Sequence, residues 1–249
     1  MDWEIGARLF ANRLRNDCRV TVLTGAGVSA ASGVPTFRGP DGLWKSHRPE
    51  ELATPEAFVR DPRLVWEWYD WRRQRLAGCA PNRAHEVLAV WSQRYPRFTL
   101  ITQNVDGLHE RAGTLNVVRF HGSIWDVSCW NGCGSSPRTW RDETVPYPEI
   151  PPRCPHCQGP LRPGVVWFGE GINPEVLEIC HTALDCDLFA TVGTSSVVYP
   201  AASLALEAKR RGAFTVEVNL EATPASDRLD LSLQGPAEVI LDRVEQLLG

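Results

Sequence analysis

The sequence predicts an α/β fold, in which a parallel sheet carries helices on both faces and two inserts form a smaller unit. Short apolar runs rich in β-branched residues alternate with helical patterns, an order typical of a parallel sheet covered on both sides. A glycine-rich turn directly follows the first run. A proline-rich segment with paired cysteines, residues 123–162, interrupts the alternation.

The first half of the chain supplies three of the expected strands. A helical pattern over 4–16 precedes CRVTVLT at 18–24, an apolar β-branched run typical of a buried strand. Residues 36–60 are rich in proline, glycine and charge, and they predict a loop with short helices. Two helices and two more buried strands are then predicted at 62–77, 81–95, 98–104 and 116–122.

The second half continues the alternation after the proline-rich insert. GVVWFGE at 164–170 resembles a strand, and the runs at 187–195 and 213–221 predict two more. Helical patterns separate and follow these runs, at 174–184, 200–211 and 236–248. The sequence shows no internal repeat.

Composition excludes several classes of protein. The 249 residues are 43% hydrophobic, enough for a packed core, and the net charge of −4 gives no basic footprint for nucleic acid. No apolar run approaches the 18 or so residues of a membrane span. The N-terminus contains acidic residues and no apolar core of a signal peptide, so we expect a cytoplasmic protein without membrane or nucleic-acid partners.

The glycine turn predicts a dinucleotide site. Gly25, Gly27 and Ala30 fit G-x-G-x-x-G/A between a strand and a helix, where close backbone approach and a helix N-terminus favour pyrophosphate. A plain strand–helix turn is the alternative. No acidic strand end follows about 20 residues on, as an ordinary Rossmann dehydrogenase would have, so Asn219 and Glu221 are the candidate ribose acceptors. We expect a discontinuous Rossmann-like dinucleotide-binding domain from 1–35, 81–122 and 163–249, with inserts at 36–80 and 123–162.

The paired cysteines predict a zinc site. Cys129 and Cys133 form C-x3-C, Cys154 and Cys157 form C-x2-C, and 20 residues separate the pairs. Four thiolates leave no open coordination position, so the zinc should be structural, replacing the core that this insert cannot build. His156, inside the second pair, is expected to point outward, and a role as a metal ligand is the alternative. The other cysteines are interpreted as small buried hydrophobic residues: Cys18, Cys79, Cys180 and Cys186.

Polar residues at two strand ends predict a reaction centre. TQNVDGLH at 102–109 places amides and an acid after one strand, and His121 ends the next. Ligands of open α/β sheets bind at the carboxyl ends of strands. His121 is therefore a candidate general base, although a structural histidine is the ordinary alternative.

Together these motifs resemble one family. GAGVSAASGVPTFRG, TQNVDGLH, FHG, the two cysteine pairs, WFGE, GTSSVVYPA and EVNLE occur in the order seen in the sirtuins, the NAD-dependent protein-lysine deacylases. The resemblance spans about residues 20–240. It implies that NAD is consumed as co-substrate, that acyl-lysine proteins or peptides are the partners, and that nicotinamide, free lysine and an O-acyl-ADP-ribose are the products.

The resemblance also assigns residue roles. His121 is the implied general base, with Asn104 as a second catalytic residue. Phe37 and Arg38 would close over the nicotinamide ribose, and residues 165–170, including Val166, Trp167, Phe168, Gly169 and Glu170, would pair with the substrate backbone as an added strand. The implied cofactor-binding residues are Gly25, Ala26, Gly27, Ser29, Phe37, Arg38, Gln103, Asn104, Asp106, Gly193, Thr194, Ser195, Asn219, Leu220, Glu221 and Ala237.

The segment VWEWYDWRRQRL at 65–76 admits two interpretations. The ordinary one is an amphipathic helix with aromatic residues packed inward. However, Tyr69 and Arg72 lie three residues apart on one helix face, and they match the Tyr-x-x-Arg pair of the desuccinylase/demalonylase branch (class III) of the sirtuins. Ala53 matches the small residue that widens the acyl pocket in that branch. Thr36 departs from the family's commoner Asp.

A guanidinium and a phenol suit an acyl group that ends in a carboxylate. We therefore expect preferential removal of succinyl and malonyl groups from protein lysine. Trp66, Trp68 and Trp71 are interpreted as packing residues, and Arg73 and Arg75 as solvated. Three alternatives stay open on the same chain: a protein that is mainly a deacetylase, a protein ADP-ribosyltransferase, or an NAD-binding sensor without turnover. The oligomeric state is also open, and the sequence is compatible with a monomer.

Overall fold

The larger of two structural units is built on a six-stranded sheet. The computed structural model describes residues 3–35, 49–134 and 137–249. The sheet has the order β3-β2-β1-β7-β8-β9, and all its strand pairs are parallel. The strands are β1 (Val20–Thr24), β2 (Phe98–Thr102), β3 (Val117–Arg119), β7 (Leu188–Val192), β8 (Phe214–Asn219) and β9 (Leu231–Gln234). The predicted parallel sheet is confirmed.

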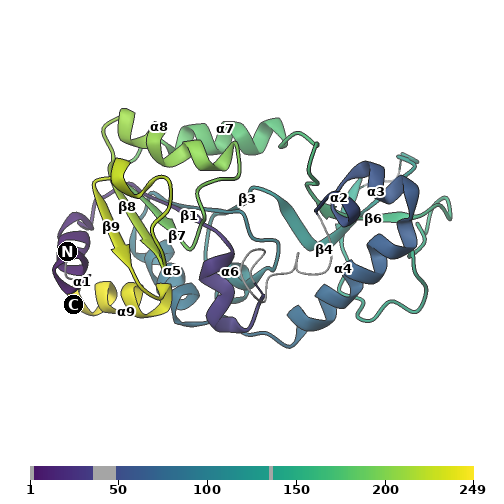
Figure 1. The fold of residues 1–249 in the computed structure, drawn as a ribbon, viewed down its shortest axis with the longest axis horizontal. Coiled ribbons are helices and arrows are strands. Elements are labelled where there is room, and N and C mark those ends of the chain that lie inside the picture. The colour runs from purple at the N-terminus through teal and green to yellow at the C-terminus, as the bar shows by residue number, and fades with distance from the viewer. Residues whose placement is uncertain (1–2, 36–48, 135–136) are drawn as a thin grey trace.

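Helices cover both faces of this sheet, as Figure 1 shows. α1 (Trp3–Arg13), α5 (Arg83–Arg94) and α9 (Ala237–Leu247) lie on one side, and α7 (Pro174–Ala183) and α8 (Leu204–Arg210) on the other. Successive β1 side chains alternate between the two sides: Val22 packs into the core under α1, α5 and α9, while Leu23 packs into the core under α7 and α8. The larger unit therefore has two hydrophobic cores, one on each face of the sheet.

The order of the sheet reverses between β1 and β7. The chain runs outward from β1 to β2 and β3, then returns through β7 to β8 and β9. Open α/β sheets bind ligands at such a reversal, in the crevice outside the carboxyl ends of the two strands. The turn after β1 leads into η1 (Ala26–Ser32), a 3-10 helix of seven residues.

The second unit packs helices against a small antiparallel sheet of order β5-β4-β6 (Figure 1). Its strands are β4 (Gly122–Cys129), β5 (Thr139–Arg141) and β6 (Leu161–Val165), and its helices are α2 (Pro49–Leu52), α3 (Pro55–Arg60) and α4 (Pro62–Ala77). Aromatic side chains fill the space between them, among them Phe58, Trp66, Trp125 and Trp167. The two predicted inserts thus share one core.

α4 has the bounds predicted for it. Asp61 caps its first turn by accepting from the Leu64 N–H at 3.0 Å, and Pro62 occupies the first helical position. Trp66 and Trp68 are buried as expected, but the packing interpretation of Trp71 is wrong, because its side chain is 41% exposed. Arg75 is exposed and lies over the Trp71 ring.

The expectation that Arg73 is solvated is wrong. Its side chain is completely buried and donates to the carbonyl oxygens of Ile124 and Asp142 and to the Tyr147 hydroxyl. It also pairs with the Asp142 carboxylate at 3.5 Å. These partners lie 51 to 74 residues further along the chain. The helical pattern of 62–77 alone could not predict them.

Three further sequence expectations need correction. The predicted strand at 164–170 ends at Val165, because residues 166–170 form a turn held by hydrogen bonds. Strand β9 was not predicted, since its four residues, LSLQ, carry no β-branched apolar run. Cys79 is partly exposed, whereas Cys18, Cys180 and Cys186 are buried as expected.

Candidate active site

A cavity of about 850 Å³ lies at the carboxyl ends of the parallel strands, where the two units meet. It brings together residues that were predicted from motifs far apart in the chain. Those lining it are Gly25, Ala26, Gly27, Ala53, Tyr69, Arg72, Gln103, Asn104, His121, Val166, Trp167, Phe168, Gly169, Glu170, Gly193, Thr194, Ser195, Asn219, Leu220 and Glu221.

Five predicted residues are not in that lining. Ser29 and Asp106 lie in a buried polar cluster behind it, and Ala237 is buried at the start of α9 within the main core. Phe37 and Arg38, like Thr36, lie outside the described residues.

Two glycine turns meet at the floor of the cavity. The N–H of Gly25 donates to the Val192 carbonyl at 3.0 Å, and that of Gly27 donates to the Gly193 carbonyl at 2.8 Å. A Cβ atom on Gly27 would lie 2.8 Å from the Gly193 Cα and carbonyl oxygen. Gly193 itself has φ of +61°, which favours glycine. The glycines therefore let the turns after β1 and β7 touch at the crevice.

A buried polar cluster supports the residues after β2. Ser29 Oγ donates to Asp106 Oδ2 at 2.8 Å, and Asn104 Nδ2 donates to the Gly25 carbonyl at 3.0 Å and to Ser29 Oγ at 3.3 Å. His85 Nε2 lies 3.3 Å from the same hydroxyl. Burial raises the pKa of Asp106 and lowers the pKa of His85 to about 4. The cluster thus fixes Asn104 and Asp106 before any ligand binds.

His121 has the geometry of a general base. Its Nδ1 lies 3.1 Å from the Gln103 carbonyl oxygen, which can only accept, so Nδ1 carries the proton in the neutral ring. Burial lowers the pKa of His121 below its ordinary value near 6.5. The ring is therefore neutral at pH 7, with the lone pair on Nε2 available to take a proton.

One wall of the cavity comes from the small unit. Tyr69 and Arg72 extend from one face of α4, and both are buried, at 2% and 7% exposure. The guanidinium of Arg72 lies 4.7 Å from the Trp68 ring centre and 5.6 Å from that of Tyr69. Burial lowers the pKa of Arg72, and the nearby Tyr69 and Asp106 partly offset this. A buried guanidinium on an aromatic wall has the chemistry to bind an anion.

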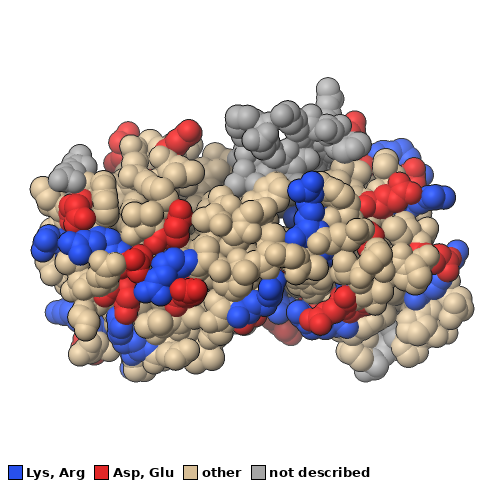
Figure 2. Space-filling view, turned by 90° about the horizontal axis from the view of Figure 1, so that it is seen from below, with Lys and Arg blue, Asp and Glu red and all other residues tan. Residues whose placement is uncertain are grey.

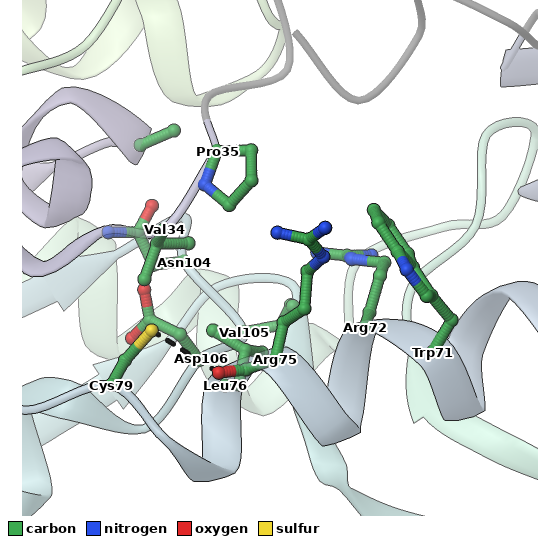
Figure 3. A pocket seen from close by; sticks show the side chains of 11 residues that line it. Val34, Pro35, Trp71, Arg72, Arg75, Leu76, Cys79, Asn104, Val105 and Asp106 are labelled. Atoms are coloured by element: carbon green, nitrogen blue, oxygen red, sulfur yellow. Dashed lines mark hydrogen bonds between the residues drawn. The ribbon is translucent and has the colours of Figure 1, made fainter. Parts of the chain in front are cut away.

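A smaller cavity of about 30 Å³ lies beside this wall. Figure 3 shows α4 contributing Trp71, Arg72 and Arg75, with Cys79 just beyond the end of that helix and the Asn104–Asp106 segment below Pro35. Arg72 lines both cavities, so it lies between the large cavity and Asp106.

At the opposite end of the large cavity, a buried carboxylate stabilises the segment that follows β8. Glu217 on β8 is 1% exposed and accepts from the hydroxyls of Thr223, Ser226 and Ser232. Asn219 Nδ2 donates to the Glu221 carbonyl at 3.0 Å. These contacts order the segment that carries the predicted ribose-binding residues Asn219, Leu220 and Glu221.

The four predicted cysteines meet at one point. The sulfur atoms of Cys129, Cys133, Cys154 and Cys157 all lie within 4.8 Å of one another. Two of the sulfur pairs are 3.5 and 3.8 Å apart, and a tetrahedral zinc with bonds near 2.3 Å requires about 3.8 Å between sulfurs. The residues fit a structural zinc. His156, exposed, is not among the cluster residues.

Several cavity residues were not predicted. Trp68, Val105, Val198, Tyr199 and Pro200 also line the cavity. Trp68 lies in the same aromatic segment as Tyr69, and the last three lie in GTSSVVYPA, so the quoted motifs contained them although no binding role was assigned to them.

The surface shows no single dominant charge on the face in Figure 2, where basic and acidic side chains are interspersed. Within the described ranges, no helix has the length and apolar character needed to cross a membrane.

Comparisons with known proteins agree with this site. A sequence model of the Sir2 family matches residues 25–200. An NAD-dependent protein deacylase of Aquifex aeolicus is 51% identical over 230 residues, 92% of this chain and 95% of that protein. NAD-dependent protein deacylase 1 of Archaeoglobus fulgidus is 47% identical over 228 residues, 90% of this chain and 91% of that protein.

Solved structures of similar proteins contain ligands. A complex of a Sir2 homolog with NAD superposes with a TM-score of 0.86 at 44% identity, covering 99% of this chain and 94% of that chain. A Sir2 complex with a p53 peptide and NAD+ gives a TM-score of 0.84 at 30% identity, covering 96% of each chain.

Proposed function

This chain belongs to the Sir2 family and is an NAD-dependent protein deacylase, and we propose that it removes succinyl and malonyl groups from lysine in preference to acetyl groups. The observation that carries the proposal is the pair of buried side chains, Tyr69 and Arg72, on the cavity wall next to the small residue Ala53. Acyl-lysine proteins or peptides are the proposed partners.

The proposed reaction uses the strand-end residues of the larger unit. NAD supplies the ADP-ribose that accepts the acyl group, with release of nicotinamide. His121, neutral and oriented by Gln103, takes a proton from a ribose hydroxyl at Nε2. Asn104 and Asp106 are held by Ser29 beside this position, so they orient the reacting end of the co-substrate.

The segment 166–170 links the base to the cavity wall formed by Tyr69 and Arg72, which we call the acyl wall. The N–H of Val166 donates to the His121 carbonyl at 3.0 Å, and that of Phe168 donates to the Ala53 carbonyl at 2.9 Å. We propose that the remaining backbone groups of this segment bind the substrate backbone beside the acyl-lysine. The acyl chain would then pass between Ala53 and Tyr69 and reach Arg72.

Electrostatics favours an acidic acyl group. A succinyl or malonyl carboxylate gives the buried Arg72 guanidinium a hydrogen-bonded counter-charge, which an acetyl methyl group cannot supply. Hydrogen bonds to charged groups contribute about 1.5–3 kcal/mol each. Two such bonds correspond to a preference on the order of 100-fold or more in kcat/KM.

A second candidate is an enzyme that is mainly a deacetylase. It is favoured by the electrostatic interaction between Arg72 and Asp106, which gives the guanidinium a negative neighbour within the protein itself. Arg72 would then stabilise Asp106, and Tyr69 would be a packing residue.

An assay of three acyl-lysine peptides with three protein variants distinguishes the two candidate functions. One lysine peptide carrying acetyl, malonyl or succinyl is assayed with NAD, using wild type, Arg72→Met and Arg63→Met. Arg63 is the matched control, because it lies on the same helix with its side chain 76% exposed. We expect the succinyl-to-acetyl ratio of kcat/KM to exceed 100 in wild type and Arg63→Met, and to fall by at least tenfold in Arg72→Met. A ratio below one in wild type refutes the proposal.

A further inference from the structure

The indole of Trp167 is fixed on several sides. Its ring lies 3.8 Å from the Arg162 guanidinium carbon and packs against Phe58, with ring centres 5.4 Å apart. Its backbone N–H donates to Glu170 Oε2 at 2.8 Å, and both oxygens of that carboxylate accept from Arg162. Trp167 is 2% exposed. The side chain therefore has one position and one direction for its N–H.

That N–H is directed at the acyl wall. Trp167 Nε1 donates to the Tyr69 hydroxyl oxygen at 3.0 Å, across 98 residues of sequence. The Tyr69 ring is held edge-on against Trp68, with ring centres 4.7 Å apart at 82°. With both rings fixed, rotation of the phenolic O–H is the remaining freedom of the Tyr69 side chain.

The hydrogen bond from Trp167 determines the direction of the Tyr69 O–H bond. A phenolic oxygen offers one O–H donor and accepts in the plane of its ring. When the indole N–H occupies one side of the oxygen, the O–H must turn to the other side. Tyr69 lines the cavity, so its hydroxyl is set as a donor toward a bound group and not as an acceptor. A donor favours a carboxylate, whereas an exposed lone pair would repel it.

We propose that Trp167 is a specificity-determining positioning residue, whose indole N–H fixes the Tyr69 hydroxyl as a hydrogen-bond donor to the carboxylate of the acyl substrate. This inference rests on the proposed preference for succinyl and malonyl groups. Trp167 does not itself bind the carboxylate; it acts through Tyr69. Arg162 and Glu170 hold the indole in place.

The predicted effect has a defined size. Removing the indole N–H lets the Tyr69 hydroxyl rotate, so only part of the phenol's contribution to carboxylate binding is lost. We expect Trp167→Phe to lower the succinyl-to-acetyl ratio of kcat/KM by about three- to tenfold, the range of one neutral hydrogen bond. The loss should be larger in Tyr69→Phe, which removes the donor itself.

A double-mutant cycle tests the mechanism. The ratio of kcat/KM for succinyl and acetyl peptides is measured in wild type, Trp167→Phe, Tyr69→Phe and the double variant. Each ratio is taken within one protein, so a general loss of activity cancels. We expect Trp167→Phe to lower the ratio in the wild-type background and to leave it unchanged in the Tyr69→Phe background. Benzothienylalanine at position 167 replaces the indole N–H by sulfur with the same ring shape, and it gives the same test if Trp167→Phe does not fold.

The outcomes separate this inference from the proposed function. If wild type prefers succinyl and Tyr69→Phe lowers the ratio, but loss of the indole N–H does not, the positioning role of Trp167 is refuted alone. An equal effect of Trp167→Phe with and without the Tyr69 hydroxyl also refutes it, because it then acts independently of Tyr69. If wild type prefers acetyl, the proposed function fails and this inference fails with it.

Discussion

Replacing Arg73 by methionine should destabilise the protein strongly, whereas the same replacement of the exposed Arg75 on α4 should change the stability little. Arg73 is completely buried and joins α4 to the sheet of the cysteine-bearing insert through Ile124, Asp142 and Tyr147. Methionine keeps an unbranched apolar stem, and it removes the charge and every donor. The matched control is Arg75→Met, because Arg75 is exposed two residues further on.

The magnitude follows from the groups left behind. Two buried carbonyl oxygens lose their donor, at about 1–3 kcal/mol each, and the Asp142 carboxylate loses its counter-charge. The Arg73 Nε has no partner among the described residues, and its removal returns part of this cost. The net loss should be about 3–5 kcal/mol, the usual cost of breaking a buried ion pair.

Urea denaturation followed by tryptophan fluorescence measures this loss. With a slope near 3 kcal/mol/M, the midpoint of Arg73→Met should fall by about 1–1.7 M, while Arg75→Met should stay within about 0.5 kcal/mol of wild type. Equal midpoints for the two variants would show that Arg73 is not the buried link described above.

Further predictions concern pH, metal and the glycine turns. The acid limb of the kcat/KM profile should lie below pH 6.5, because burial lowers the pKa of His121 and the neutral base persists to lower pH; a limb above pH 7 contradicts this. Burial also lowers the pKa of His85 to about 4, so between pH 6.5 and 4 the unfolded chain binds a proton that the folded chain does not. Stability should therefore fall by up to about 3 kcal/mol as pH falls through this window, and His85→Gln should flatten that slope; an unchanged slope rejects it. Chelation should unfold the cysteine-bearing insert and abolish activity, and a zinc-free protein that keeps its rate would refute the structural role. Gly27→Ala should raise KM for NAD at least tenfold, because its Cβ would press on Gly193, and an unaltered KM would exclude this contact as a requirement.

The sequence predicted the large sheet because most of its strands are short, strongly apolar runs that can be recognised without knowing their neighbours in space. β1, β2, β7 and β8 are β-branched runs buried on both faces, and each has a clear boundary. β9 was missed because a short edge strand needs little apolar sequence when a neighbour such as β8 already provides the template. The strand predicted at 164–170 stopped at Val165 because side-chain bonds to Glu170 close a turn there.

The residues of the site also fall into those that local sequence predicts and those that it does not. The zinc site could be predicted from the spacing of Cys129, Cys133, Cys154 and Cys157, because pairs of zinc ligands lie a few residues apart in the chain. The burial of Arg73 and the contact between Trp167 and Tyr69 could not be predicted. Both depend on two inserts that are distant in sequence and share one core. Charge and amphipathicity describe a helix face, but they do not identify what packs on it.

The most direct test of the proposed function is a competition in one vessel. Equal concentrations of acetyl-, malonyl- and succinyl-lysine peptides of one sequence are incubated with the wild-type enzyme and NAD, and the O-acyl-ADP-ribose products are quantified by mass spectrometry. The initial product ratio equals the ratio of kcat/KM values. The buried Tyr69 and Arg72 predict that the succinyl and malonyl products dominate the acetyl product. An excess of O-acetyl-ADP-ribose would contradict the proposal and leave a deacetylase in which these two side chains belong to the scaffold.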